Sequence, residues 1–287
     1  MKNNYTNSNK SIKSEKDSGA VSKQQDGSVL PTSWNPVSTW YDEYLQKSNT
    51  LQSEVILPNL LRMLGIKKGD SILDVACGQG YFTERFAQLG ANVYGTDISK
   101  ELVSIAEKNA KKQNLNINYR ILPAHKAPHL PDMRVETITV VLAFENIENI
   151  ADTLTEMNRV LVPGGRVLIV LMHPAFRVPQ ESSWGYDTER NVQYRTVERY
   201  LSEATYKIDM HPGQGGKKHI STGDITLSFH RSMQWYMKHF AKAGFVMSRL
   251  EEWISHKESN TGPRKLAEDR ARKEIPMFMC VELKKGV

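Results

Sequence analysis

The chain has 287 residues, 39% of them hydrophobic, which is enough apolar material for one large domain with a full core. Its formal net charge of +6 is too modest to argue strongly for a nucleic-acid partner. The cysteines, Cys77 and Cys280, provide no disulfide framework, and every apolar run is too short to span a membrane. No apolar segment follows the first lysines, so we expect a cytoplasmic protein without a secretory signal.

Two regions of different composition divide the chain. Residues 1–33 are rich in Asn, Ser, Lys and Gln and contain almost no large apolar side chains. Such a segment buries too little surface to offset the entropy of ordering, so it is expected to be a disordered extension. Residues 34–287 are expected to form the folded domain.

Strand and helix patterns alternate through the first part of this domain. Two helical segments, around residues 40–45 and 51–65, come first. The strands expected after them are 71–76, 92–96, 117–122, 136–143 and 166–172, and the helices between them are 81–89, 99–113 and 150–161. This order predicts a parallel sheet with helices on both faces.

The alternation stops after the fifth strand. Residues 173–230 combine turn residues with short alternating segments, which predicts an insertion of β-hairpins and loops on the sheet edge. A helix at 232–243 and strands at 245–253 and 276–283 are expected to complete the sheet. We interpret the insertion as a cover over a substrate.

A glycine motif between the first strand and its helix indicates a nucleotide ligand. Gly78 and Gly80 follow the strand, but Thr83 stands where a dinucleotide-binding motif has its third glycine. The chain also lacks the Gly-Lys-Ser/Thr of a phosphate-binding P-loop. Two acids, Asp74 and Asp97, end neighbouring strands beside the glycines.

The pattern Asp-x-Ala-x-Gly-x-Gly resembles the first motif of class I S-adenosylmethionine-dependent methyltransferases. The segments "ETITVVLAFENIEN" and "LTEMNRVLVPGGRVLIV" resemble later parts of the same family, so that the likeness covers about residues 55–172. The resemblance implies a Rossmann-like seven-stranded mixed sheet with the last strand antiparallel, and S-adenosyl-L-methionine as cofactor. The motifs HPAFR, SSWG and MHPG are similar to those of a bacterial subgroup of these enzymes.

The resemblance also implies which residues bind the cofactor. Asp97 is expected to accept hydrogen bonds from the ribose hydroxyls, and Asp74 to lie near the amino-acid end. After the third strand, Ala124 and His125 replace the acid with which most relatives bind adenine. The expected cofactor-binding residues are Tyr41, Asp74, Ala76, Cys77, Gly78, Gly80, Asp97, Ile98, Ala124, His125 and Phe144.

Candidate catalytic groups follow the fourth and fifth strands. His173 is the first candidate for a general base because its ordinary pKa is about 6.5, although it can equally serve only to order its loop. Glu145 is a second candidate base, or a ligand for a substrate cation. The histidines of the insertion, among them His211, His219 and His230, match no metal-ligand spacing, and we expect no metal.

These observations favour methyl transfer to a small-molecule acceptor held in a closed, aromatic and modestly charged pocket. An RNA methyltransferase is the first alternative, with Lys217, Lys218 and the basic residues at 264–273 as its surface, although interleaved acids suggest a solvated helix there. A non-catalytic cofactor-binding protein stays open. An NAD-dependent oxidoreductase is disfavoured by the missing glycine.

Overall fold

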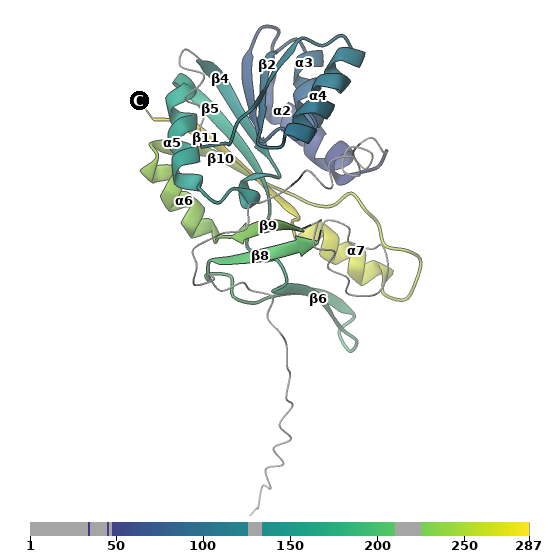
Figure 1. Ribbon diagram of the computed structural model, residues 1–287. Coiled ribbons are helices and arrows are strands. Elements are labelled where there is room, and N and C mark those ends of the chain that lie inside the picture. Colours follow the sequence, from purple (N-terminus) through teal and green to yellow (C-terminus); the bar gives the residue numbers. More distant parts are fainter. Residues whose placement is uncertain (1–33, 35–44, 46–47, 126–133, 210–224, 287) are drawn as a thin grey trace, which may run out of the picture.

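The computed structural model describes residues 34, 45, 48–125, 134–209 and 225–286 (Figure 1). The expected N-terminal extension and Tyr41 lie outside the described residues. Within the described part of the chain, no helix is long and apolar enough to cross a membrane.

The central element of the fold is a seven-stranded sheet with the order β10-β11-β5-β4-β1-β2-β3. The five consecutive strands from β5 to β3 pair in parallel, whereas β11 is antiparallel to both of its neighbours, as expected for the last strand. The strands are β1 (Ser71–Val75), β2 (Asn92–Asp97), β3 (Ile117–Ile121), β4 (Val135–Val141), β5 (Leu161–Met172), β10 (Phe245–Trp253) and β11 (Phe278–Lys285).

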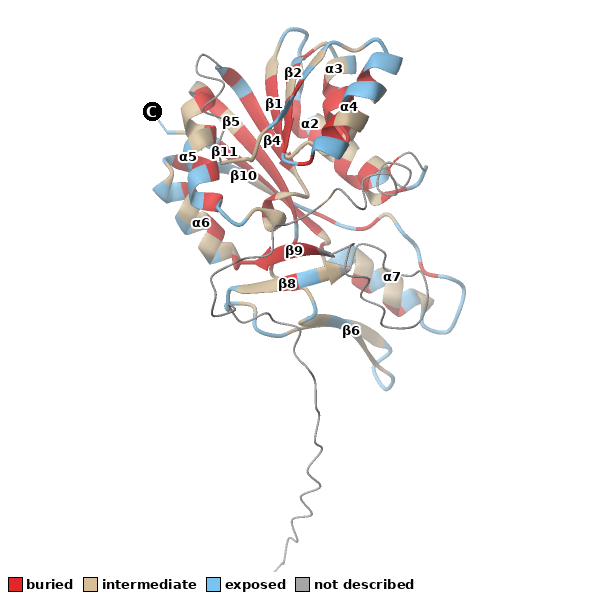
Figure 2. Ribbon diagram, viewed as in Figure 1, coloured by how far each residue is buried: buried red, intermediate tan, exposed pale blue. Residues whose placement is uncertain are grey.

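Both faces of this sheet are buried, which explains why its central strands are almost continuously apolar. Along β5, Val167, Ile169 and Leu171 belong to one core cluster, and Leu168 and Val170 belong to the other. Figure 2 shows this burial concentrated in the middle of the sheet.

Helices cover the two faces separately (Figure 1). One core cluster is closed by α5 and α6, and the other by α2 and α3, while α4 packs on β2 and β3. The helical segments are η2 (Gln52–Ile56), α2 (Leu57–Leu64), α3 (Tyr81–Gln88), α4 (Lys100–Lys112), the short turn η3 (Phe144–Asn146), α5 (Ile150–Val160), α6 (Met233–Lys242) and α7 (Lys265–Glu274). The expected arrangement of helices on both faces is confirmed.

The boundaries of these elements follow local chemistry. Gly65 ends α2 in a left-handed conformation (φ 53°), and the Ser99 hydroxyl accepts the Leu102 N–H at the start of α4. One expected boundary differs. β5 begins at Leu161, before the Pro-Gly-Gly sequence, because a bulge opposite Val135 and Thr137 accommodates those residues within the strand.

The insertion forms two β-hairpins, as its alternating pattern predicts. β6 (Ser182–Asp187) pairs with β7 (Val192–Val197), and β8 (Ala204–Asp209) pairs with β9 (Ile225–His230). β9 contacts η3 at the carboxyl end of β4, and α7 packs against β7. The insertion therefore lies across the carboxyl ends of the central strands (Figure 1).

Candidate functional site

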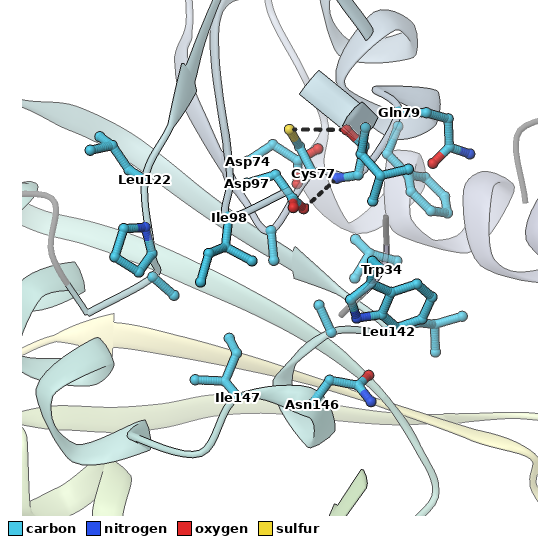
Figure 3. Close-up of a pocket in the computed structure, with 18 of the residues that line it drawn as sticks. Trp34, Asp74, Cys77, Gln79, Asp97, Ile98, Leu122, Leu142, Asn146 and Ile147 are labelled. Atoms are coloured by element: carbon cyan, nitrogen blue, oxygen red, sulfur yellow. Dashed lines mark hydrogen bonds between the residues drawn. The ribbon is translucent and has the colours of Figure 1, made fainter. Parts of the chain in front are cut away.

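A cavity of about 320 Å³, here called the ligand pocket, opens at the carboxyl ends of β1 and β4. These strands are neighbours in the sheet, but the chain continues from β1 to α3 on one face and from β4 toward α5 on the other. Such a switch point is where open α/β sheets bind ligands. Loops after β1, β2, β3 and β4 line the pocket (Figure 3).

The loop after β1 is held in an unusual backbone conformation. Gly78 and Gly80 have φ values of 58° and 87°, and Ala76 also has a positive φ of 55°. A positive φ is unfavourable for alanine, so the backbone is strained at Ala76. The Cys77 N–H donates to the Thr96 carbonyl oxygen at 3.0 Å, so the loop is tied to β2.

Asp97 ends β2 and lies in the wall of the ligand pocket, only 7% exposed. Its Oδ2 accepts the Gly78 N–H at 2.9 Å (Figure 3), and its Oδ1 accepts the Ser99 N–H at 2.8 Å. Burial raises the pKa of this carboxyl, while the backbone donors oppose the rise. An ionised carboxylate has about four acceptor sites, so two remain for hydroxyl groups of a ligand.

Asp74 ends β1 and is buried at the base of the same pocket. The hydroxyls of Thr139 and Thr83 donate to its Oδ1 and Oδ2 at 2.7 and 2.6 Å. Burial raises the pKa of Asp74 to about 6, and these hydrogen bonds limit the rise. The carboxyl is therefore fixed in orientation and mostly ionised at neutral pH, as an anchor for a cationic group requires.

An apolar surface lies beside Asp97. Ile98 is 61% exposed although it is a large aliphatic residue, and its side chain lines the ligand pocket with Leu122. Ala124 and His125 border the same region, as the sequence predicts. An exposed isoleucine next to a buried acid suits a ligand with a flat apolar ring attached to a polyhydroxyl group.

Comparisons with known proteins agree with this geometry. Residues 73–169 match the family described as "Methyltransferase domain". The structure of an S-adenosylmethionine-dependent methyltransferase from Mesorhizobium loti is similar, with a TM-score of 0.62 and 26% identity over 79% of this chain and 96% of that one. Residues 73–169 of this chain thus form a methyltransferase domain, within a fold similar to that of S-adenosylmethionine-dependent methyltransferases.

Two curated relatives are similar over shorter stretches. A demethylmenaquinone methyltransferase of Tropheryma whipplei (strain Twist) is 34% identical over 142 residues, which is 49% of this chain and 58% of that protein. A ubiquinone biosynthesis O-methyltransferase of Rhizobium etli is 30% identical over 109 residues, 37% of this chain and 42% of its own length. The chain therefore spans only about half the length of these two curated relatives.

The ligand pocket suits S-adenosylmethionine, the cofactor for which the similar structure is named. Asp97 offers acceptors for ribose hydroxyls, Ile98 and Leu122 offer an apolar wall for adenine, and Asp74 offers a carboxylate for the ammonium group. A cavity of about 320 Å³ is within the range of small-molecule sites. Gly78 lines this cavity in a left-handed conformation, and a Cβ there would meet no atom within 4 Å beyond its chain neighbours.

Two of the expected cofactor-binding residues do not line the ligand pocket. Phe144 is fully buried in the core, with its ring centroid 5.9 Å from that of Tyr236 and 6.2 Å from that of Phe240. Gly80 lies behind the loop, where a Cβ would come within 2.4 Å of the Tyr119 hydroxyl. The structure therefore does not place either residue in the pocket wall, in contrast to the expectation.

Some pocket residues were not predicted. The structure places Trp34 in the wall (Figure 3). Leu45 lines the same pocket, and the expected Tyr41 lies outside the described residues. Asn146 and Ile147 reach the pocket from the turn after β4 (Figure 3). One conformational signal marks this turn: Leu142, at the end of β4, has a positive φ of 53°, which is rare for leucine and typical of functional sites.

A second cavity of about 510 Å³, the insertion pocket, adjoins the first. Trp34 and Asn146 line both cavities, and the remaining wall comes from the insertion, the turn after β4 and α6. Its aromatic residues include Phe229 and Tyr236, as expected. The expectation of modest charge is wrong, because Arg177, Arg195 and Arg231 also line it.

The two candidate bases occupy different environments. Glu145 lines the insertion pocket, with Oε1 accepting the Met172 N–H at 3.4 Å and Oε2 without a partner among the described residues. Burial raises the pKa of Glu145 to about 7. This carboxyl can therefore both hold and release a proton near neutral pH.

His173 lies in neither cavity and is only 1% exposed. Its Nε2 is 2.6 Å from Oε1 of Glu252, and its Nδ1 accepts the Ala175 N–H at 3.2 Å. Because Nδ1 accepts, Nε2 carries the proton and donates to the carboxylate. Burial lowers the pKa of this imidazole. These contacts favour the alternative that His173 orders the loop after β5.

The other histidines of the insertion bear on the metal hypothesis. His230 Nε2 is 2.8 Å from the Tyr200 carbonyl oxygen, and the described residues contain no cluster of three or more His, Cys, Asp or Glu side chains suited to a metal. His211 and His219 lie outside the described residues.

Proposed function

We propose that the protein transfers a methyl group from S-adenosylmethionine to a small organic molecule bound in the insertion pocket. The observation that carries this proposal is the pair of adjoining cavities, which share Trp34 and Asn146 as walls. One cavity suits the cofactor of the family, and the other has the size of a small-molecule site. The curated relatives, named for demethylmenaquinone and for ubiquinone biosynthesis, support a small-molecule acceptor.

The chain contributes mainly positioning to such a reaction. S-adenosylmethionine supplies an activated methyl group on a positively charged sulfur. Asp74 and Asp97 orient the ligand from two strand ends, and Asn146 is held by donation from its Nδ2 to the Leu227 carbonyl oxygen at 2.8 Å. Aligned reactants reach effective molarities of roughly 10⁵–10⁸ M, so alignment alone accounts for much of the rate.

Glu145 is the residue that we propose as general base. An acceptor hydroxyl or ammonium must lose a proton during the transfer, whereas a nucleophile without a proton needs no base. The free Oε2 of Glu145 is available for this proton in the insertion pocket. His173, with both ring nitrogens engaged, then has a positioning role for the loop after β5.

The RNA alternative depends on a basic surface. Lys217 and Lys218 lie outside the described residues. On α7, Lys265 is paired with Asp269 at 2.7 Å, and the Arg272 guanidinium donates to the Ser259 hydroxyl at 3.2 Å. Asp269 thus neutralises Lys265, as the interleaved acids predict, which supports a small-molecule acceptor over RNA.

Incubation with methyl-labelled S-adenosylmethionine tests the proposal. In the presence of a bacterial small-molecule extract, we expect label in the low-molecular-weight fraction together with S-adenosylhomocysteine. Glu145→Gln should lower this turnover about 10²-fold or more and keep cofactor affinity, whereas Glu198→Gln, an exposed acid of the same insertion, should change neither. Label in added bulk tRNA, with tRNA binding that weakens steeply as salt rises, would support the RNA alternative. Cofactor binding without transfer to either fraction would indicate a non-catalytic protein.

Two further proposals concern the location of the protein in the cell and the role of its N-terminal residues. We infer a cytoplasmic location, which the two unpaired cysteines support. We also propose that residues 1–33 are dispensable for folding and cofactor binding, because their composition offers no periodic apolar face.

A further inference from the structure

Three arginine side chains converge on the insertion pocket from separate parts of the chain. Arg177 comes from the loop after β5, Arg195 from β7, and Arg231 from the residue that follows β9. Among the described residues, none of the three forms an ion pair. Partly buried positive charges without a counter-ion are costly, so their concentration in one cavity requires a compensating ligand or another role.

Arg231 is the most deeply buried of the three, with 5% exposure. Its Nη2 donates to the Glu148 carbonyl oxygen at 2.9 Å, whereas its Nη1 has no partner within the described part of the chain. The guanidinium carbon lies 5.0 Å from the ring centre of Phe229 and 4.9 Å from that of Trp235. The Tyr236 hydroxyl also interacts with this guanidinium. These contacts fix the guanidinium, and Nη1 still lacks an acceptor in good hydrogen-bond geometry.

Arg177 and Arg195 form a second centre of positive charge around Trp184. Their guanidinium carbons lie 5.5 and 5.1 Å from the ring centre of this tryptophan. Arg195 is held by donation to the Phe176 carbonyl oxygen and to the Ser182 hydroxyl, at 2.9 and 2.7 Å. Arg177 Nε is buried and has no described partner. Burial and the charges of neighbouring arginines lower the pKa of Arg177 to about 10, so it remains charged at neutral pH.

The rest of the insertion pocket is largely apolar. Glu145 is the acid in its wall, and with a pKa of about 7 it is only about half ionised near neutral pH. Val178, Phe229, Met172 and Tyr236 supply aliphatic and aromatic surface between the charged groups. The pocket therefore combines an apolar chamber with a net positive charge and unpartnered N–H donors.

We propose that the methyl acceptor is a small organic acid, whose carboxylate is bound by the free N–H groups of Arg177 and Arg231 and whose apolar body packs against Val178 and Phe229. Guanidinium groups match carboxylate geometry and bind it through charge-assisted hydrogen bonds. This inference rests on the proposed function, because it assigns the acceptor of the same site. The carboxylate is a recognition group, and the atom that is methylated is a separate part of the acceptor.

Ligand-observed NMR on the full chain saturated with S-adenosylhomocysteine tests this inference. The probes are small aromatic and aliphatic carboxylic acids, each paired with its primary amide, which has nearly the same shape without the charge. We expect several acids to bind and to bind about tenfold or more tightly than their amides. No preference for acids over amides in any pair, or tighter binding of inorganic phosphate than of every acid, would overturn the inference.

Variants locate the binding. Arg177→Met and Arg231→Met should each weaken the binding of the acids about tenfold or more and leave their amides unaffected. Arg190→Met, an exposed arginine of the same insertion, is the matched control and should change nothing. Arg177→Met alone decides the question if Arg231→Met does not fold, since Arg177 has fewer structural partners. Acid binding that survives in Arg177→Met would overturn the assignment.

The titration of S-adenosylhomocysteine on the same samples separates two kinds of failure. Intact cofactor binding with no preference for acids contradicts only this inference. Loss of cofactor binding in the unmodified protein contradicts the proposed function itself.

Discussion

The backbone N–H of Gly78 donates a hydrogen bond of 2.9 Å to Oδ2 of Asp97. This bond joins the loop after β1 to the end of β2, so that the glycine backbone and the acid form one rigid corner of the ligand pocket (Figure 3). The same carboxylate thus shapes the loop and keeps acceptor sites for a ligand.

Replacement of this acid should abolish tight cofactor binding. We expect Asp97→Ala to weaken S-adenosylhomocysteine affinity at least about tenfold, because hydrogen bonds to a charged acceptor contribute roughly 1.5–3 kcal/mol each. Asp70→Ala is the control, since Asp70 precedes β1 and accepts the Lys67 N–H at 2.8 Å away from the pocket. Calorimetry on both folded variants gives the comparison, and an unchanged affinity in Asp97→Ala would remove this residue from the ribose site.

Gly80 should be intolerant of a side chain for a steric reason. Gly80→Ala should lower the free energy of unfolding by roughly 2–3 kcal/mol, because it combines a positive φ with a Cβ 2.4 Å from the Tyr119 hydroxyl. Gly69 also has a positive φ, but a Cβ there would meet no atom within 4 Å, so Gly69→Ala should lower the free energy of unfolding by only about 1 kcal/mol. Adding Tyr119→Phe to Gly80→Ala should recover part of the loss in urea denaturation. Equal costs at Gly69 and Gly80 would contradict this packing.

Cofactor affinity should depend on pH through Asp74. The pKa of Asp74 is raised to about 6, so the carboxyl is mostly protonated below that pH. The carboxyl must then lose this proton before the carboxylate can bind an ammonium group. S-adenosylhomocysteine affinity should therefore fall as the pH decreases from 7 to 5, with a limiting slope of about tenfold per unit. Asp74→Asn should bind more weakly and with a flatter pH dependence across this range. A pH-independent affinity in the unmodified protein would exclude an ionised Asp74 from binding.

His173 should matter for stability more than for cofactor binding. Loss of its contacts with Glu252 and the Ala175 N–H should make His173→Ala less stable by about 1–3 kcal/mol, with unchanged S-adenosylhomocysteine affinity. Since its pKa is lowered in the folded state, the protein should lose stability as pH falls below about 6.5, and this part of the loss should be absent in the variant. Thermal denaturation at pH 7.5 and 5.5 measures both effects. Unchanged stability of the variant with lost turnover would instead restore His173 as a base.

Much of the central fold follows from local sequence signals. The strand expected at 92–96 is one residue longer in the structure and ends at Asp97. The strand expected at 245–253 has the same bounds as β10. Both segments could be predicted because turn residues bound them. The glycine loop and its two acids could also be predicted from the sequence, because their roles depend on backbone conformation and on where the strands end.

Side-chain directions after β4 and β5 were harder to predict. The short turn η3 (Phe144–Asn146) rotates Phe144 into the core while Asn146 faces the pocket, and sequence order alone does not distinguish these outcomes. His173 follows the adjacent strand, as expected, but its partner Glu252 lies on β10, 79 residues away. The sequence therefore located the residues after β4 and β5 near the site, but it did not show which of their side chains face the pocket.

The arginines of the insertion pocket illustrate the same limit. Arg177, Arg195 and Arg231 are far apart in sequence, and each is unremarkable among 38 lysines and arginines. Only the pairing of the hairpins and their packing over the turn after β4 bring them to one cavity. Non-local contacts of this kind are absent from composition and periodicity.

Calorimetric titration of the full chain with S-adenosylhomocysteine and, separately, with NAD⁺ tests the central claim most directly. The shape of the ligand pocket and the absence of a third glycine after Gly80 predict one site for S-adenosylhomocysteine and no measurable binding of NAD⁺. Tight binding of NAD⁺, or no binding of S-adenosylhomocysteine by the folded protein, would contradict the assignment of this pocket to the methyl donor.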